Sequence, residues 1–361
     1  MAQYYTKFFL IMACCMHVFA IKWLNEPLRD VKKWSRPACT SENFHLNAKQ
    51  RGICRHQTNY MDSVSSGAAD TISSCRTLFQ EDSWNCYNIL KAPHFDYNIN
   101  NATKESAFVH ALSAAALAYH VATDCASGKI ANCRCSTRYQ GGVTTLPNVP
   151  GKVILYSRAC PHVYEKGIHF ARKFLSPGEK KFKKVAKKSP YRAGQLKIAE
   201  HNREVGYKVF RTEKYKYIKC GCRGNTGSCP IKTCYQSIDY FPVMAKEIRK
   251  RYEEASRVAI DKKTGALTPT NGIDEIVPEQ ELIYSDNSLK KCSTKKARTD
   301  MRYRRCSLDP NAKDYCKKMC CDGKHKATEI VVAVQCSCKF VYCCRVDCQW
   351  CNHKKMVQIC I

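Results

Sequence analysis

Residues 219–234 read “KCGCRGNTGSCPIKTC”, a stretch in which four cysteines and three glycines surround a single serine, Ser228. The spacing allows nested disulfides, the outer two cysteines pairing with each other and the inner two likewise. Such pairing would form a doubly stapled hairpin whose glycines supply positive φ at the tip. Closing a loop of this length is worth up to about 3 kcal/mol, so the hairpin can stand clear of a core. Ser228 would then lie on a rigid tip, where its hydroxyl suits modification or contact with a partner.

The first twenty residues predict export. Lys7 is followed by the apolar run FFLIMACCMHVFA, and small residues precede a cleavage point after Ala20, the pattern of a secretory signal peptide at 1–20. A signal anchor is the alternative, but this run of 13 residues is short for a bilayer span of about 20. We therefore expect a secreted protein that passes through the endoplasmic reticulum.

Cysteine usage agrees with export. Of the 26 cysteines, Cys14 and Cys15 lie in the signal peptide, and the 24 that remain are an even number. This count favours up to twelve disulfides formed in an oxidising compartment. A zinc site built from the closely spaced cysteines at 336–351 is the alternative, but secretion favours oxidised pairs, so no metal is expected. One N-glycosylation sequon, at Asn101, fits the same route.

No catalytic centre is indicated. Ser228 lies in GNTGSC, which lacks the G-x-S-x-G spacing of a nucleophile elbow, and no histidine is marked as its base. The sequence thus predicts neither an enzyme nor a cofactor. The remaining hypotheses are a signalling ligand, or an antagonist or matrix protein that binds without activating.

The chain is strongly basic, with 60 Lys and Arg against 31 Asp and Glu and a net charge of +29. In a secreted protein the abundant polyanion is sulfated glycosaminoglycan, so heparan sulfate is the expected partner and nucleic acid is not. One basic stretch stands out, and a solvated loop is its alternative interpretation. The lysines of this predicted heparan-sulfate patch are Lys180, Lys181, Lys183, Lys184, Lys187 and Lys188.

The cysteines divide the chain into two parts. Twelve lie within 39–234 and twelve within the much shorter 292–360. The first part contains apolar stripes of helical period near 61–79, 163–174 and 244–258, together with helix-forming segments near 102–123 and 194–212. The second has strand-like alternation in “IVVAVQCSCKFVYCCRVDC” at 330–348, which indicates a β-hairpin held by disulfides.

These patterns predict a disulfide-rich α+β fold. An N-terminal helical bundle is expected at 21–260, carrying the stapled hairpin at 219–235. A segment rich in Gly, Pro, Thr and acidic residues at 261–281 is predicted to be a linker or a long loop, and a cysteine-rich C-terminal domain follows at 282–361.

The hairpin stretch resembles the signature of the Wnt signalling proteins, C-K-C-H-G-x-S-G-S-C-x-x-[KR]-T-C-W. Here “CGCRGNTGSCPIKTCY” keeps all four cysteines, the Gly-Ser-Cys core and Lys232-Thr233. “FQEDSWNC” ending at Cys86, “TKESAFVHALSAAALAYHVATDC” ending at Cys125, “HNREVGYKV” at 201–209 and the twelve-cysteine tail are similar to further family motifs.

The resemblance implies a fold and a function. A saposin-like helical core would carry the hairpin as a thumb, and a small cysteine-knot-like β-hairpin domain would form an index finger. Ser228 would be esterified with palmitoleate by the acyltransferase Porcupine, and the carrier Wntless would take the ligand to the surface. The ligand would then act in the extracellular space and matrix, with membrane association through the lipid.

The resemblance also implies receptor contacts. The lipid on Ser228 would lie in a groove of a Frizzled cysteine-rich domain, with Lys232 in the same hairpin, and an LDL-receptor-related or kinase-type co-receptor would join the complex in cell fate and cell polarity signalling. The expected fingertip residues are Phe340, Val341, Tyr342, Cys343 and Cys344. Arg223, Thr226, Tyr235 and Tyr342 depart from the family pattern, so the resemblance does not specify which Frizzled is preferred.

The disulfides that the resemblance implies leave Cys39 and Cys54 to pair with each other. In the N-terminal part they are Cys75–Cys86, Cys125–Cys133, Cys135–Cys160, Cys220–Cys234 and Cys222–Cys229. In the C-terminal part they are Cys292–Cys321, Cys306–Cys316, Cys320–Cys360, Cys336–Cys351, Cys338–Cys348 and Cys343–Cys344.

Overall fold

The computed structural model describes most of the chain in two compact units. Unit 1 comprises 1–78 and 88–288, and unit 2 comprises 79–87 and 289–361. The described residues are 21–25, 31, 33–84, 86–92, 95, 97–130, 133, 143–144, 153–155, 161–177, 179–212, 216–222, 232–238, 240–270, 276–288, 292, 301–341 and 345–361. The expected signal peptide at 1–20 lies outside them. The residues that follow it are folded into unit 1, since Ile21, Trp23 and Leu24 are buried.

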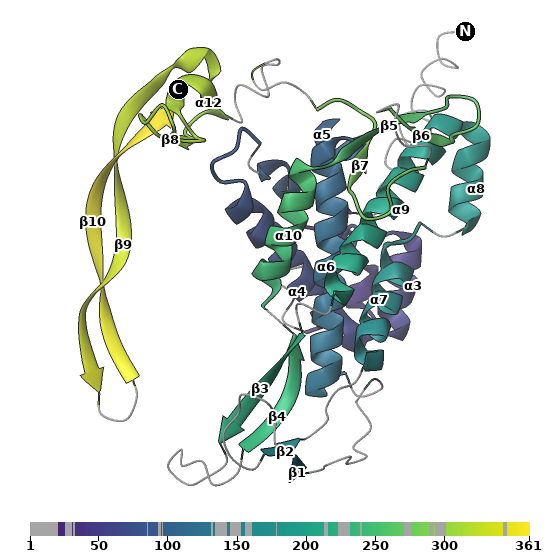
Figure 1. Cartoon of the computed structure of the whole chain (residues 1–361), viewed down its shortest axis with the longest axis horizontal. Coiled ribbons are helices and arrows are strands. Elements are labelled where there is room, and N and C mark those ends of the chain that lie inside the picture. The colour runs from purple at the N-terminus through teal and green to yellow at the C-terminus, as the bar shows by residue number, and fades with distance from the viewer. Residues whose placement is uncertain are drawn as a thin grey trace. The chain divides into compact units, whose positions relative to one another are not determined.

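Unit 1 is a helical bundle built around one long helix (Figure 1). Its helices are α3 (Ala48–His56), α4 (Met61–Leu78), α5 (Tyr97–Asn100), α6 (Lys104–Ser127), α7 (Pro161–Leu175), α8 (Glu179–Lys188), α9 (Pro190–Arg211) and α10 (Phe241–Glu253). Every residue of α6 from 105 to 118 is buried, because α4, α7, α9 and α10 all pack around it. The prediction of a helical bundle with a buried helix near 102–123 is confirmed.

Small residues let the surrounding helices approach α6 closely. A Cβ atom added to Gly206 of α9 would lie 2.2 Å from the carbonyl oxygen of Ala111, and one added to Gly167 of α7 would lie 2.4 Å from that of Ala118. Real Cβ atoms do not approach a carbonyl oxygen this closely, so both positions require glycine. The alanines of α6 provide the flat surface against which these glycines lie.

Short strands form two small sheets in unit 1. The first contains β1 (Val143–Thr144), β2 (Val153–Leu155), β3 (Lys216–Cys222) and β4 (Lys232–Ile238) in the order β1-β2-β4-β3. The second contains β5 (Ser256–Ile260), β6 (Leu267–Pro269) and β7 (Ile283–Tyr284) in the order β6-β5-β7. Short 3-10 turns lie at Ala38–Thr40, Glu42–Phe44, Thr58–Tyr60 and Tyr87–Lys91.

The second sheet corrects the predicted linker at 261–281. Val258 and Ile283 pack with Ile198 of α9 in one apolar cluster, to which Leu267 also adds. The described residues of 256–284 are therefore part of unit 1, and the predicted domain start at 282 falls within it. The predicted helical stripe near 244–258 is also too long. The helix α10 ends at Glu253, and residues 256–258 of the stripe belong to β5.

The motif HNREVGYKV is explained by this sheet. The side-chain amide of Asn202 donates to the carbonyl oxygen of Ile283 at 2.9 Å and accepts from its backbone N–H at 2.9 Å. One amide thus satisfies both backbone groups of a strand residue, as a neighbouring strand would. Four residues later, Gly206 contacts α6, so the same turn of α9 joins the sheet to the central helix.

Unit 2 is a long twisted β-ribbon on a small cystine core (Figure 1). Its elements are β8 (Arg305–Cys306), α12 (Cys316–Met319), a 3-10 turn at Cys321–Gly323, β9 (His325–Val341) and β10 (Arg345–Cys360), with strand order β8-β10-β9. The predicted hairpin is confirmed. The core consists of Met301, Cys306, Cys316, Met319, Cys320, Cys321 and Cys360, so disulfides replace most of the apolar side chains that a larger domain would bury.

Residues 79–87 belong to unit 2, although their sequence position predicted the helical domain. The Arg304 guanidinium donates to the backbone oxygens of Ser83 at 2.6 Å, Asp82 at 2.6 Å and Gln80 at 3.1 Å. Burial lowers the pKa of Arg304 to about 10, and these carbonyl oxygens compensate for the lost hydration. The interaction leaves no sequence periodicity, so patterning could not reveal it.

Substitution of Gly206 tests the helix packing. We expect Gly206→Ala to lower the free energy of unfolding by about 1–3 kcal/mol, because the new methyl group must displace α9 from the Ala111 carbonyl. Gly52→Ala is the matched control, since nothing lies within 4 Å of its added Cβ; we expect it to stabilise α3 by about 0.5–1 kcal/mol. Urea unfolding of the secreted protein measures both, and equal effects would contradict the packing model.

The buried His110 predicts a pH dependence of stability. Burial and the nearby Arg203 cation hold the pKa of His110 well below its ordinary value of 6.5, so only the unfolded chain takes up a proton near that pH. Stability from this group is therefore complete above about pH 6.5 and falls by up to about 1.4 kcal/mol per pH unit below it. Urea unfolding between pH 7.5 and 5.5 should show this slope.

His110→Leu should remove that part of the slope. A residual slope is expected from His201, whose pKa is also lowered by burial. Identical slopes for the natural protein and the variant would rule out His110 as a source of the pH dependence.

Candidate functional site

The hairpin strands β3 and β4 frame the candidate site. They are antiparallel, and their register places Cys220 directly opposite Cys234, followed by Gly221 opposite Thr233 and Cys222 opposite Lys232. Directly opposed residues of an antiparallel pair lie on the same face at disulfide-compatible spacing. The register therefore fits the Cys220–Cys234 pair that the resemblance implies.

The tip of the hairpin lies outside the described residues. Nine residues, 223–231, separate Cys222 from Lys232, and among them are Ser228, Cys229, Arg223 and Thr226. For Lys232 and Tyr235 the structure gives the strand position only. The described part is thus the base of the hairpin, which fixes where the nine-residue segment starts and ends.

Two further strands support this base, and sequence analysis missed both. β2 runs parallel to β4, with Ile154 opposite Thr233 and Leu155 opposite Cys234, and β1 is antiparallel to β2. A two-stranded hairpin alone is only marginally stable, and neighbouring strands stiffen it. Strands of two and three residues carry no periodic signal that could have predicted them.

The helical bundle holds both ends of the hairpin. β3 follows α9, whose last residue Arg211 pairs with Glu165 of α7 at 2.8 Å. β4 leads into α10, which begins with the buried Phe241, and the Phe241 ring lies 5.6 Å from the ring of Tyr119 on α6. The hairpin is therefore fixed at its base by helices that all pack on α6 (Figure 1).

A second candidate surface lies at the end of the β-ribbon in unit 2. Phe340 is 71% exposed and Val341 44% exposed at the end of β9, while Tyr342, Cys343 and Cys344 lie outside the described residues. Disulfides Cys338–Cys348 and Cys336–Cys351 cross the ribbon behind this end. Trp350 on β10, 69% exposed, was not predicted as a surface residue.

Seven disulfides in the described part of the chain match expected pairs. The structure contains Cys39–Cys54, Cys125–Cys133, Cys292–Cys321, Cys306–Cys316, Cys320–Cys360, Cys336–Cys351 and Cys338–Cys348. Cys75 and Cys86 are also disulfide-bonded. The expected pairs Cys135–Cys160, Cys222–Cys229 and Cys343–Cys344 include residues outside the described part of the chain.

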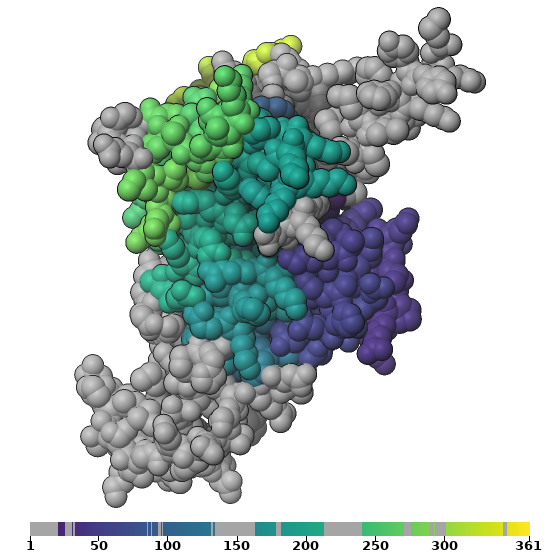
Figure 2. Space-filling view, turned by 90° about the vertical axis from the view of Figure 1, so that its right-hand side faces the viewer, coloured from purple at the N-terminus to yellow at the C-terminus, as the bar shows by residue number. Residues whose placement is uncertain are grey.

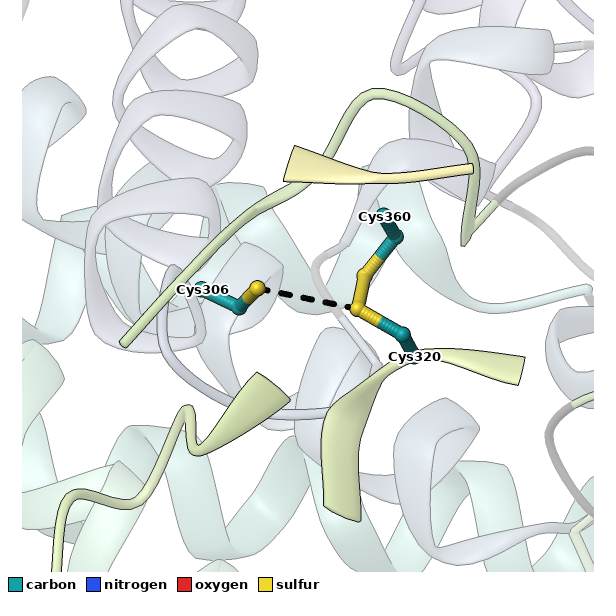
Figure 3. A group of neighbouring side chains, drawn as sticks. All are labelled: Cys306, Cys320 and Cys360. Carbon is teal, nitrogen blue, oxygen red and sulfur yellow. Dashed lines mark hydrogen bonds between the residues drawn. A yellow bond between two sulfur atoms is a disulfide. The ribbon is translucent and has the colours of Figure 1, made fainter. Parts of the chain in front are cut away.

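Three sulfur atoms in unit 2 lie as close together as metal ligands would (Figure 3). The Sγ atoms of Cys306, Cys320 and Cys360 are all within 4.8 Å of one another. However, Cys320 is bonded to Cys360 and Cys306 to Cys316. An oxidised sulfur has no thiolate to offer a metal, so the 3.6 Å approach of Cys306 to Cys320 is a contact between two disulfides in a packed core.

The predicted heparan-sulfate patch is helical rather than a loop. It forms α8, in which Lys183, Lys184, Lys187 and Lys188 are exposed, while Phe182 and Val185 are half-buried. The side chains of Lys180 and Lys181 lie outside the described set. Phe182 and Val185 are three residues apart, a spacing that predicts one apolar helix face.

Asn101 lies just before the central helix. Its side-chain amide donates to the carbonyl oxygen of Tyr97 at 2.9 Å, and the Asn101 side chain is partly exposed. Thr103, the hydroxyl residue of the same sequon, is buried and caps α6 by accepting from the backbone N–H of Ser106. The sequon therefore coincides with the start of α6.

The described residues define the class of the protein: a disulfide-rich α+β chain in which a helical unit carries a cysteine-flanked hairpin and a second unit carries a cystine-stapled ribbon. A family model described as wnt family matches residues 42–361. The chain therefore belongs to the Wnt family. Wnt family proteins are secreted signalling ligands, and this chain is a ligand of that family rather than an enzyme.

Individual relatives agree with the family model. The chain is 29% identical over 358 residues to protein Wnt-11b-1 of Xenopus tropicalis, covering 97% of each chain. It is 31% identical over 321 residues to protein Wnt-11 of Xenopus laevis, covering 87% of this chain and 86% of the relative. A chain in the solved structure of human WLS in complex with WNT8A matches 84% of this chain and 94% of its own length, with a TM-score of 0.56 and 24% identity, which supports the fold.

Membrane-spanning helices are a separate question. Within the described ranges, no helix is both long enough and apolar enough to cross a bilayer.

Peptide mapping tests the hairpin staples. We expect non-reducing digestion of the secreted protein to give peptides linking Cys220 to Cys234 and Cys222 to Cys229. The Cys125–Cys133 pair, which the structure contains, serves as the internal standard. Alkylation of any hairpin cysteine as a free thiol, or a link from the hairpin to another segment, would contradict the nested pairing.

Proposed function

We propose that this chain is a Wnt ligand whose hairpin carries a palmitoleoyl ester on Ser228 and binds the cysteine-rich domain of a Frizzled receptor. The single observation that supports this most directly is the hairpin register. It places Cys220 opposite Cys234 at the base of the nine-residue segment that contains the Gly-Ser-Cys motif. Membership of the Wnt family indicates the modification, which would be esterification of Ser228 in the endoplasmic reticulum.

The lipid supplies affinity that a polar loop lacks. Burial of an acyl chain is worth about 0.8 kcal/mol per CH₂, so a sheltered palmitoleoyl chain contributes on the order of 10 kcal/mol before ordering costs are subtracted. A hairpin fixed to α6 through α9 and α10 limits those costs, because the bundle has already ordered the base of the loop. We infer that Lys232, at the start of β4, lies beside the groove of the Frizzled cysteine-rich domain that would hold the lipid.

The second receptor contact is proposed at the end of the β-ribbon. Phe340 and Val341 are exposed there, and apolar side chains held on a cystine-stapled ribbon lose little entropy when a receptor covers them. Together with Tyr342, Cys343 and Cys344 they would form the fingertip. An LDL-receptor-related or kinase-type co-receptor would complete the signalling complex for cell fate and polarity.

Further partners follow from the same proposal. Porcupine would transfer the acyl group, and Wntless would carry the ligand. The solved structure of human WLS in complex with WNT8A, which contains a chain of similar fold, supports Wntless as a partner. The exposed lysines of α8 would contact heparan sulfate in the extracellular matrix. Asn101 would carry an N-glycan added before Thr103 is buried at the start of α6.

Substitution of Ser228 tests the proposal. We expect Ser228→Ala to abolish acylation and to reduce secretion and receptor activation to background, because the Gly-Ser-Cys motif contains no other hydroxyl that could form the ester. Mass spectrometry of the hairpin peptide and a β-catenin or cell-polarity assay measure these effects. Thr226→Ala, which removes a hydroxyl two residues away, is the matched control and should keep the acyl group. An acyl adduct of the same mass on Ser228→Ala would disprove the assignment.

A further inference from the structure

The exposed face of α8 concentrates positive charge. Lys183 and Lys187, and likewise Lys184 and Lys188, are four residues apart, so each pair lies on one side of the helix. Like charges at this spacing destabilise a helix. Lys184, Lys187 and Lys188 form no ion pair with any residue that the structure describes. The face therefore holds charge that a bound polyanion would neutralise.

A second basic element packs near the end of this helix. The turn between β5 and β6 contacts Pro190, which is the first residue of α9 and the second residue after the end of α8. Gly265 has φ +67°, and a Cβ added there would lie 2.4 Å from the Pro190 carbonyl oxygen, so only glycine allows this approach. The Lys197 ammonium group also donates to the Gly265 carbonyl oxygen at 2.9 Å. The turn is thus fixed against the segment that directly follows Lys188.

Asp261 organises this turn and presents its lysines. Its carboxylate accepts from the backbone N–H of Lys263 at 2.9 Å and from the N–H and hydroxyl of Thr264 at 2.6 and 2.8 Å. These hydrogen bonds lower the pKa of Asp261, which stays ionised and offsets one positive charge. Lys262 and Lys263 are both exposed. Their backbone is held in place before any ligand arrives.

We propose that α8 and the β5–β6 turn form one composite surface that binds a linear sulfated polysaccharide. The composite surface consists of Lys183, Lys184, Lys187, Lys188, Lys262 and Lys263. In Figure 2 the teal surface that includes α8 and α9 borders the green surface that includes β5 and β6. This proposal rests on the proposed heparan-sulfate contact of α8, and it adds the two turn lysines, which the sequence had placed in a linker.

The geometry favours an extended chain over a small anion. The ten residues of α8 span about 15 Å, and the turn extends the lysines beyond the end of the helix, so a single phosphate or sulfate could reach only one part of the surface. Flexible, exposed lysine side chains suit a ligand with repeated charges, because each contact releases counterions from the polyanion. A secreted ligand meets such repeated charges on sulfated polysaccharides.

Three double variants with equal loss of charge test the composite surface. They are Lys262→Gln/Lys263→Gln in the turn, Lys187→Gln/Lys188→Gln in α8, and Lys246→Gln/Lys250→Gln in α10 as the control. The affinity of each secreted full-length protein for a heparin octasaccharide is measured over a series of NaCl concentrations. Each contacting lysine contributes about one to the slope of log affinity against log salt.

We expect the turn variant and the α8 variant each to bind the octasaccharide about tenfold more weakly, with a slope lower by up to about two, and the α10 variant to bind as the natural protein does. Normal binding by the turn variant would overturn the composite surface. Equal weakening of all three would overturn it as well, because net charge would then explain the effect. The proposal would also be overturned if the turn variant or the α8 variant lost binding to anionic phosphatidylserine vesicles but bound heparin as the natural protein does. Heparin binding requires neither Ser228 nor a receptor, so these outcomes are independent of the acylation test.

Discussion

The close contact of glycine-bearing helices with α6 is the constraint on which the rest of unit 1 depends. Gly206 and Gly167 bring α9 and α7 against the backbone oxygens of α6, and any larger residue would push these helices outward. Along the chain, α9 leads into β3 and β4 leads into α10. The position of the hairpin base is therefore set by packing elsewhere in the bundle.

Unit 2 is stabilised by disulfides rather than by helix packing. A ribbon of two long strands has no face that it can bury on its own, and its base contains few apolar side chains. Disulfides at Cys292–Cys321, Cys306–Cys316 and Cys320–Cys360 occupy that core, and two more cross the ribbon. The half-buried Arg304 holds residues 79–87 in this unit by donating hydrogen bonds to their backbone oxygens. Covalent links thus replace apolar burial in a unit whose ribbon stays largely exposed.

Patterning predicted the elements whose own sequence carries a period. The alanine-rich α6, the apolar stripes of α4 and α7, and the alternation of β9 and β10 are local signals, and the structure contains all of these elements. Long-range contacts left no such signal. β2 has three residues, and residues 79–87 join unit 2 through backbone carbonyls.

The predicted linker shows the same limit. Its Gly, Pro and Thr content indicated an open segment, yet Gly265 is required by a close approach to Pro190 and Ile283 is paired with Asn202. The residues of the candidate site could be predicted, because the spacing of the cysteines around Ser228 can be read from the sequence. The position of the hairpin base could not, because it depends on how α6, α9 and α10 pack together.

Hydrogen exchange tests the central claim most directly, namely that a rigid α6 platform holds the base of the hairpin. Amide exchange would be followed by mass spectrometry on the secreted protein, with peptides from α6, from β3 and β4, and from exposed α8. If this claim is right, α6 exchanges slowest, at the rate of global unfolding, and β3 and β4 are more protected than α8. Exchange of α6 as fast as α8, or of β3 and β4 faster than α8, would contradict it.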